Sequence, residues 1–482
     1  MTDAKTEIIL KWFEEISKIP RCSKNEQAIC DWLENWGKSR GFTVRKDKVQ
    51  NLVIEVPAAE GYESAAPLVI QGHMDMVCEK TKDSDHDFTK DPIRFIYEDG
   101  WLTADKTTLG ADNGIALAMA LTAADEKDVA HPPLELLFTV DEETGLTGAM
   151  ALEPGFIKGK TLINLDAESE GVLTVGCAGG KDTELRNAYE IHAAPADYKS
   201  VQIIAQGMRG GHSGVDIHQK RANAIHILGR ALNEITKITD VRMAGFSGGT
   251  AHNAIPRDAE ALVCLPESDA GKVESVLTQL DNDLKAEYAK TDPKICLRMN
   301  DTDEDAAAKA MGKPCTRRIL DLILAIPHGV SDMSADVDGL VETSSNFALI
   351  QVENGDVKIQ TSQRSPVMNR LDWLTNRVES VGRLAGGTAE SGNGYPAWQP
   401  NLDSELLKRC KTVYKELFGK EPVIEVIHAG LECGIIGSKY TGMEMISFGP
   451  DMKDAHSPDE KIEVASIGKV WTFLEGLIKS YH

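Results

Sequence analysis

Apolar positions in the first third of the chain switch between helical and strand spacing. Ile8, Ile9, Trp12, Phe13 and Ile16 lie on one helical face, and Pro20 follows as a stop. Ser23 and Glu26 form a capping-box pattern for a second helix that runs to about Arg40. Strands are then expected at 42–45, 52–56, 68–71, 134–140 and 161–165, with a small-residue helix at about 114–124. This alternation predicts an α/β sheet with helices on both faces.

Three of these strand-like runs are followed at once by an imidazole or a carboxylate. His73 follows the run at 68–71, Asp141 to Glu143 follow the run at 134–140, and Asp166 follows the run at 161–165. Ligands of open α/β sheets bind beyond the carboxyl ends of the strands. We therefore expect these side chains to meet at one edge of the sheet.

The pattern changes from about Lys181. Strands near 201–206, 241–245, 258–265, 347–352 and 357–361 and helices at 221–235 and 371–385 indicate an α+β domain. Asn354-Gly355 between the last two strands is a hairpin signal. Gly386-Gly387 and residues 391–396 are expected to form the hinge back to the first domain. The predicted division is therefore 1–185 with 396–482 as one domain and 186–395 as an insertion.

Composition and charge narrow the class of protein. A chain of 482 residues with 42% hydrophobic and 26% charged residues is long enough for two globular domains. The net charge of -23 argues against nucleic acid or an anionic membrane as a partner. The first residues lack the pattern of a signal peptide, and the nine cysteines contain no CxxC pair. We expect a cytoplasmic protein without a disulfide framework, in which Cys78 is a small packed residue.

Five short motifs gather metal-binding side chains. They are Gly72-His73-Met74-Asp75, Gly110-Ala111-Asp112-Asn113-Gly114, Asp141-Glu142-Glu143, Leu165-Asp166 and Asp454-Ala455-His456-Ser457-Pro458. Imidazole nitrogens and carboxylate oxygens bind catalytic zinc, and one bridging carboxylate can hold two ions together. Each motif alone is also typical of a cap or a surface turn, but the ordered set predicts a two-metal hydrolytic site.

The motifs resemble those of the M20 metallopeptidases, and most closely the aminoacyl-histidine (Xaa-His, carnosinase-like) dipeptidases. The resemblance rests on residues 72–77, 109–114, 141–145, 164–166, 210–214 and 428–434, and it spans both expected domains. It implies the two-domain M20 architecture, in which a mixed α/β catalytic domain carries an inserted α+β lid and dimerisation domain.

The resemblance also implies a role for each residue of the metal site. Asp112 would bridge two divalent ions, His73 and Asp166 would complete one site, and Glu143 and His456 would complete the other. Glu142 would be the general base, and Asp75 would orient His73. The ions are expected to be Zn²⁺, although Co²⁺ or Mn²⁺ suits the same donors. The family often has a cis peptide after the bridging aspartate, here Asp112-Asn113.

The inserted domain would supply the residues that bind the substrate. His212 resembles the family histidine that polarises the scissile carbonyl from the other subunit of a homodimer. Asn253 and Arg364 resemble the residues that hold the terminal carboxylate of the substrate. Gly430 resembles a further contact, from the loop before Leu431. The alternative for the loop at 210–214 is a flexible turn.

Together these features predict a di-zinc dipeptidase for aminoacyl-histidine or unspecific dipeptides. Its chemistry would be attack of a metal-held hydroxide, with Glu142 taking and returning the proton. A tripeptidase, an N-acyl-amino-acid deacylase or a carboxypeptidase of the same family is the alternative. A non-catalytic metal-binding relative is a third reading, and Glu142 discriminates against it because such a protein no longer needs a base.

Overall fold

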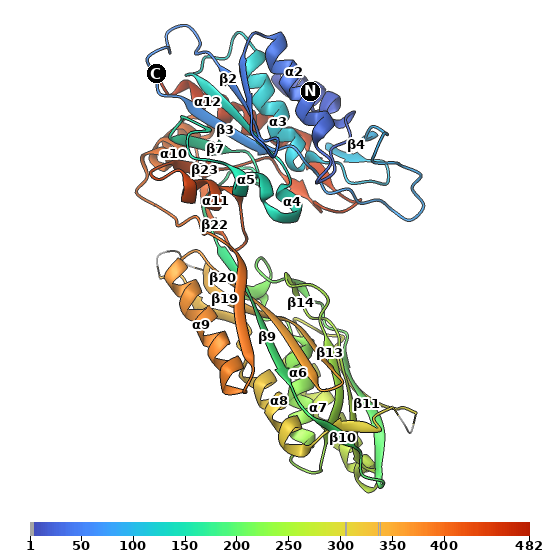
Figure 1. Cartoon of the computed structure of the whole chain (residues 1–482). Coiled ribbons are helices and arrows are strands. Elements are labelled where there is room, and N and C mark those ends of the chain that lie inside the picture. Colours follow the sequence, from blue (N-terminus) through green and yellow to red (C-terminus); the bar gives the residue numbers. More distant parts are fainter. Residues whose placement is uncertain (1–3, 304–305, 336, 338) are drawn as a thin grey trace. The chain divides into compact units, whose positions relative to one another are not determined.

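The computed structural model describes residues 4–303, 306–335, 337 and 339–482 (Figure 1). The chain forms two compact units. The first comprises residues 1–177, 398–426 and 431–482, and the second comprises residues 178–397 and 427–430. The first crossing, after residue 177, lies eight residues before the expected junction at 185, and the second, after residue 397, lies two residues beyond that at 395. The short return at 427–430 has no counterpart in the predicted division.

The first unit is built on an eight-stranded mixed sheet in the order β1-β2-β6-β3-β7-β23-β8-β22. Its strands are β1 (Thr43–Lys46), β2 (Leu52–Val56), β3 (Leu68–His73), β6 (Leu134–Thr139), β7 (Thr161–Asn164), β8 (Val172–Cys177), β22 (Val423–Ile427) and β23 (Glu444–Ser447). The central neighbours β6, β3, β7 and β23 are parallel, so their carboxyl ends share one edge. A separate sheet has the order β24 (Met452–Lys453), β25 (Lys461–Glu463), β5 (Trp101–Ala104) and β4 (Phe95–Glu98).

Helices pack around the large sheet (Figure 1). They are α1 (Ala4–Ser17), α2 (Gln27–Ser39), α3 (Ala111–Asp125), α4 (Glu142–Gly145), α5 (Thr147–Ala151), α10 (Glu405–Phe418), α11 (Glu432–Lys439) and α12 (Val464–Lys479). Helix α3 packs between α1 and β3. Its small side chains permit this close approach, since a Cβ atom added to Gly72 of β3 would lie only 2.9 Å from the Cβ of Ala116.

The second unit is an α+β structure with an antiparallel sheet in the order β16-β11-β15-β13-β19-β20-β9-β21, with β18 paired to β19. The strands are β16 (Cys296–Asp301), β11 (Tyr198–Gln206), β15 (Ala259–Pro266), β13 (Arg242–Gly248), β19 (Val341–Glu353), β20 (Asp356–Ser365), β9 (Gly179–Ala188), β21 (Thr388–Tyr395) and β18 (Gly329–Met333). The helices are α6 (Ala224–Ile235), α7 (Ala270–Glu287), α8 (Lys313–Ala325) and α9 (Met368–Leu384). Two short ribbons pair β10 (Ile191–Ala193) with β17 (Lys309–Met311) and β12 (Gly211–His212) with β14 (Ala254–Ile255). The expected hairpin at Asn354-Gly355 joins β19 to β20.

Two local predictions were wrong, namely the capping box at Ser23 and Glu26 and the hinge at residues 391–396. The Ser23 hydroxyl does not cap α2 but donates to Asp75 at 2.8 Å. Glu26 is itself the N-cap residue of α2, and its carboxylate accepts the N–H groups of Lys24 at 2.8 Å and Asp141 at 3.0 Å. Residues 391–395 are not a hinge but belong to β21, the edge strand paired with β9.

The third wrong prediction concerns the cysteines. Cys78 is not simply packed but forms a disulfide with Cys22. The two cysteines lie close because Cys22 pairs with Met76 in a parallel bridge beside β3. Tertiary contact, and not sequence spacing, therefore brings the two sulfur atoms together.

Among the described residues, no helix combines the length and the apolar character that a bilayer span requires.

Candidate metal centre

The carboxyl edge of the central parallel strands carries the candidate ligands. His73 is the last residue of β3, and Glu142 and Glu143 open α4 just after β6. Asp166 follows β7 by two residues. Because β6, β3 and β7 are adjacent and parallel, the three segments reach the same edge, as their positions in the sequence predicted.

Asp112 lies between two imidazoles from distant parts of the chain. Its Oδ1 is 3.0 Å from Nε2 of His73, and its Oδ2 is 3.1 Å from Nε2 of His456. Asp112 is near the start of α3, where its backbone is not helical, and the Asp112–Asn113 peptide is cis, as the resemblance implied. A carboxylate with an imidazole at each oxygen is suited to bridge two ions.

Two further carboxylates complete a group on each side of Asp112. Oδ1 of Asp166 is 3.4 Å from Nε2 of His73, and Oε2 of Glu143 is 3.0 Å from Nε2 of His456. In each group, His73–Asp112–Asp166 and Asp112–Glu143–His456, one nitrogen or oxygen atom per residue lies within 4.8 Å of the others. The structure thus brings all five sequence-predicted ligands together.

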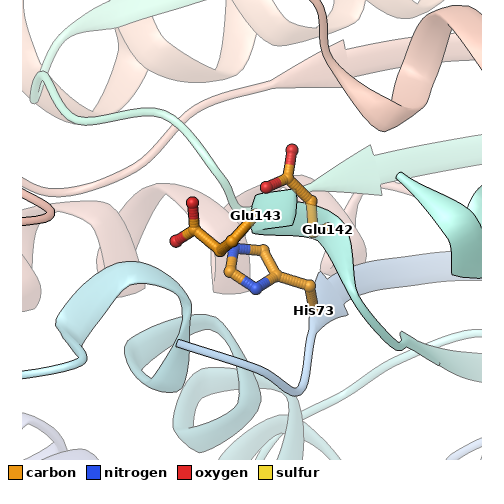
Figure 2. A group of neighbouring side chains, drawn as sticks. All are labelled: His73, Glu142 and Glu143. Atoms are coloured by element: carbon orange, nitrogen blue, oxygen red, sulfur yellow. The ribbon is translucent and has the colours of Figure 1, made fainter. Parts of the chain in front are cut away.

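Glu142 lies beside this cluster on the first turn of α4. Figure 2 shows His73 at the end of its strand with Glu142 and Glu143 on the neighbouring short helix. His73, Glu142 and Glu143 also form a close group of possible ligand atoms. Burial is the main cause that raises the pKa of Glu142 well above its usual value, and the negative charges of Asp166 and Glu143 add to this effect. A carboxylate with a raised pKa is suited to accept and return a proton near neutral pH.

The turn that presents these glutamates is fixed by hydrogen bonds. Asp141 adopts a left-handed conformation at φ 50°, which is uncommon for a residue other than glycine. Its carboxylate accepts the hydroxyl groups of Thr144 and Thr147. These bonds hold the strained residue that directs Glu142 and Glu143 towards the sheet edge.

Asp75 is fully buried behind His73. Its Oδ1 lies 3.2 Å from Nδ1 of His73 and accepts the N–H of Glu142 at 3.1 Å. Its Oδ2 accepts the N–H of Glu143 at 3.3 Å. Burial alone would raise the pKa of Asp75, but the hydrogen bond from His73 and the charge of that ring lower it to about 2. Asp75 therefore holds the imidazole of His73 and the main chain of Glu142 and Glu143 in a fixed relation.

The donor set fits divalent cations. Oε1 of Glu143 is buried and has no hydrogen-bond partner among the described residues. Burial and the charge of Asp112 raise the pKa of Glu143, while hydrogen bonds to Asp112 and Glu143 raise the pKa of His456 to about 11. The carboxylates thus favour a positive charge between them, which a proton on His456 provides in the absence of metal. A bound divalent ion would provide the same charge. Imidazole and carboxylate donors suit Zn²⁺, Co²⁺ or Mn²⁺.

Sequence reasoning missed a buried carboxylate next to the site. The carboxylate of Glu432, at the start of α11, accepts hydrogen bonds from the amide nitrogen Nε2 of Gln71 at 2.6 Å and from the hydroxyl of Thr139 at 2.7 Å. Burial is the main cause that raises the pKa of Glu432 to about 7. The contact ties α11 to the ends of β3 and β6. Glu432 belongs to the 428–434 motif, but nothing in that motif indicates its partners.

His212 lies in the second unit, on the short ribbon strand β12. Its Nδ1 accepts the N–H groups of Gly214 at 3.2 Å and Val215 at 3.0 Å. The ring proton of the neutral imidazole is therefore on Nε2, which makes Nε2 a hydrogen-bond donor. A neutral donor of this kind can polarise a carbonyl oxygen.

The other candidate substrate residues also belong to the second unit. Arg364 is buried at the end of β20, and its guanidinium donates to the hydroxyl of Tyr395 at 2.6 Å. Gly430 contacts the same ring, since an added Cβ would lie 2.7 Å from Cε2 of Tyr395. The structure thus gathers Arg364 and Gly430 around Tyr395. Asn253 is exposed and contacts the His212 loop, where its carbonyl accepts the N–H of Ser213 at 2.8 Å.

Comparison with known proteins finds relatives that match almost the whole chain. The chain is 38% identical to the cytosol non-specific dipeptidase of Escherichia coli (strain K12), over 97% of this chain and 96% of that protein. Its structure is similar to that of the aminoacylhistidine dipeptidase from Vibrio alginolyticus, with a TM-score of 0.89, 38% identity and coverage of 100% and 98% of the two chains. Aminopeptidase PepT from Bacillus cereus shares the fold, with a TM-score of 0.56 and 18% identity over 99% and 98% of the chains.

The match to a peptidase family covers most of the chain. Residues 69–480 match the family described as Peptidase family M20/M25/M40, a range that includes all the candidate ligands. Both relatives at 38% identity are named as peptide-cleaving enzymes. The chain is therefore a peptide hydrolase that belongs to peptidase family M20/M25/M40.

Proposed function

We propose that this protein is a di-zinc dipeptidase that cleaves aminoacyl-histidine, such as β-alanyl-histidine, or a broad range of dipeptides. The observation that carries the proposal is the position of Asp112 between His73 and His456, because a carboxylate with an imidazole at each oxygen could bridge two ions. The similarity to an aminoacylhistidine dipeptidase and to a non-specific dipeptidase supports the substrate class.

His73, Asp112 and Asp166 would hold one ion, and Asp112, Glu143 and His456 would hold the other. Bound there, the ions supply Lewis-acid polarisation of the peptide carbonyl and lower the pKa of water. Co²⁺ or Mn²⁺ can replace Zn²⁺ with the same donors.

The acid–base work falls to Glu142. Its raised pKa allows the carboxylate to take a proton from the attacking water and to return it to the amine that leaves. Asp75 keeps the imidazole of His73 in one orientation, and it also holds the main chain of Glu142. The base and the ligand therefore keep a fixed relation during turnover.

Substrate recognition falls to the second unit. Nε2 of His212 would donate to the carbonyl oxygen as negative charge develops on it. The guanidinium of Arg364 would bind the terminal carboxylate of the dipeptide, with Asn253 and Gly430 as further contacts. We propose a cytoplasmic homodimer, without nucleic acid or membrane as a partner, in which the second unit acts as lid and dimerisation domain.

A substrate panel tests the proposal. Zn²⁺-loaded protein is assayed for release of free amino acids from β-alanyl-histidine, other dipeptides, tripeptides and N-acetyl amino acids. We expect dipeptide cleavage that is lost after chelation and restored by Zn²⁺. Preferred cleavage of tripeptides or acyl amino acids would assign another activity of the family. A failure of the metal-loaded protein to cleave any dipeptide would overturn the proposal.

A further inference from the structure

Glu460 is a buried carboxylate four residues after His456, with 2% of its surface exposed. Its two oxygens accept the N–H groups of four successive residues, 109–112, at 2.7, 2.9, 2.8 and 3.3 Å in chain order. The last of these is the N–H of Asp112 itself. One side chain thus binds the main chain that leads into the candidate bridging ligand.

The main chain of Glu460 is itself held in place. Its N–H donates to the carbonyl of Ser457 at 3.0 Å, and its carbonyl accepts the hydroxyl of Thr103 at 2.8 Å. The next residue begins β25, whose Lys461 is paired with Thr103 of β5. The carboxylate is therefore fixed to the same turn that carries His456.

Arg21 holds the same segment from the other side. Its fully buried guanidinium donates to the carbonyl of Gly110 and, at 2.9 Å, to the carbonyl of Asp75. The peptide groups of Gly110 are thus bound at the N–H by Glu460 and at the carbonyl by Arg21. A Cβ atom on Gly110 would lie 2.6 Å from Nη2 of Arg21, and φ is 70°, so glycine is required here.

We propose that Glu460 is a positioning residue that sets the distance between Asp112 and His456. It would thereby set the affinity for the metal ion that Asp112, Glu143 and His456 would hold. The inference rests on the proposed function, because it assumes that these residues bind metal. A buried carboxylate is stable only when its oxygens are hydrogen-bonded, and the four N–H groups meet this need. The same bonds give the loop of Asp112 one position relative to the turn of His456. Partners of this kind behind a ligand typically change metal affinity by about 10–100-fold when they are lost.

Glu460→Gln is the informative variant. Its amide nitrogen would face main-chain N–H groups that need an acceptor, so two of the four bonds are lost with little change in volume. Metal-free protein is titrated with Co²⁺, with binding followed by calorimetry and by the visible absorption of the bound ion. We expect one of the two binding steps to lose about 10–100-fold in affinity, with a changed absorption band, and the other to stay as in the wild type. Glu460→Asp, which keeps the charge but is one methylene shorter, is expected to lose less.

Glu135→Gln is the matched control, because Glu135 is equally buried and accepts the N–H groups of Lys158 and Gly159 at 2.8 and 2.7 Å. It lies at the start of β6, whereas Glu142 follows its end. We expect this variant to lose thermal stability and to keep both binding steps. The inference is overturned if both Glu460 variants bind Co²⁺ with wild-type affinity, or if Glu460→Gln does not fold and Glu460→Asp binds with wild-type affinity. It is also overturned if Glu135→Gln loses as much affinity as the Glu460 variants. If the wild-type protein itself does not bind two metal ions, the proposed function is overturned instead.

Discussion

Asp112 and His456 are separated by 344 positions in the sequence, yet Oδ2 of Asp112 lies 3.1 Å from Nε2 of His456. The second unit is inserted between them, so the candidate centre depends on the return of the chain to the first sheet. Strand β23 makes this return, because it pairs with β7 in parallel, and Glu460 after it binds the N–H groups of residues 109–112.

Replacement of the candidate base separates metal binding from catalysis. In Glu142→Gln the amide cannot accept a proton, so we expect kcat to fall by about 10²–10⁴-fold while both ions stay bound. The measurement is kcat on a cleaved dipeptide together with metal content by mass spectrometry. Glu153→Gln, at an exposed position of the same unit, should behave as the wild type. Wild-type turnover in Glu142→Gln would remove Glu142 from the mechanism.

Asp75→Asn tests the residue behind His73. The amide keeps the shape of the side chain but loses the charge that orients the imidazole, so we expect metal affinity or kcat/KM to fall by about 10–100-fold. Ser23→Ala removes one hydrogen bond to Asp75 without changing its charge and should have a smaller effect. The metal content after dialysis and kcat/KM are measured for both variants and for the wild type. An Asp75→Asn enzyme with two ions and unchanged kcat/KM would contradict the role.

The Cys22–Cys78 disulfide closes a loop between residues 56 positions apart. Because the bond restricts the unfolded chain, Cys22→Ser/Cys78→Ser should lower the free energy of unfolding by roughly 2–4 kcal/mol. Urea unfolding with and without dithiothreitol gives the measurement. Reductant should destabilise the wild type but leave the double variant unchanged. If all nine cysteines of the unfolded wild type react with a thiol reagent before reduction, the bond is not formed in solution.

The second unit should lose stability in acid because of His428. Burial, and then the positive charge of Arg364, lower the pKa of His428 to about 3. The unfolded chain binds a proton below pH 6.5, whereas the folded chain does so only near pH 3. Stability from this neutral ring is therefore complete above pH 6.5 and is lost as the pH falls, by roughly 2 kcal/mol at pH 5.

Urea unfolding at pH 7 and pH 5 tests this prediction. His428→Gln retains a side chain that can bond to Ser344, the partner of Nε2 at 2.7 Å, but it does not titrate. The variant should therefore lose less stability than the wild type between the two pH values. An equal loss in both proteins would show that other groups cause the acid sensitivity.

The sequence predicted that His73, Glu143 and Asp166 would lie close together, because each stands at the end of a buried strand or shortly after it. Adjacent parallel strands bring their carboxyl ends to one edge of a sheet. Residues that act through the main chain were not predicted. Arg21 and Glu460 bind carbonyl and N–H groups of distant loops, and such partners leave no pattern of side chains in the sequence.

The wrong predictions have a similar cause. A capping box and a glycine-rich hinge are local patterns, and both were overruled by tertiary contacts. Ser23 reaches Asp75 instead of the helix, and the glycine-rich segment at 391–395 completes a sheet edge beside β9. The disulfide arises in the same way, because Cys22 is brought to Cys78 by the bridge to Met76.

The division of the first unit into three chain segments has a consequence for biosynthesis. A nascent chain that ends before residue 444 lacks β23, which lies within the large sheet, and it also lacks His456 and Glu460. All of the second unit, 178–397 and 427–430, is therefore synthesised before β23, whereas the sheet of the first unit is completed only afterwards. On the proposed function, Asp112 and His456 can therefore hold an ion together only after residue 456 has been synthesised, whereas His73, Asp112 and Asp166 are all present much earlier.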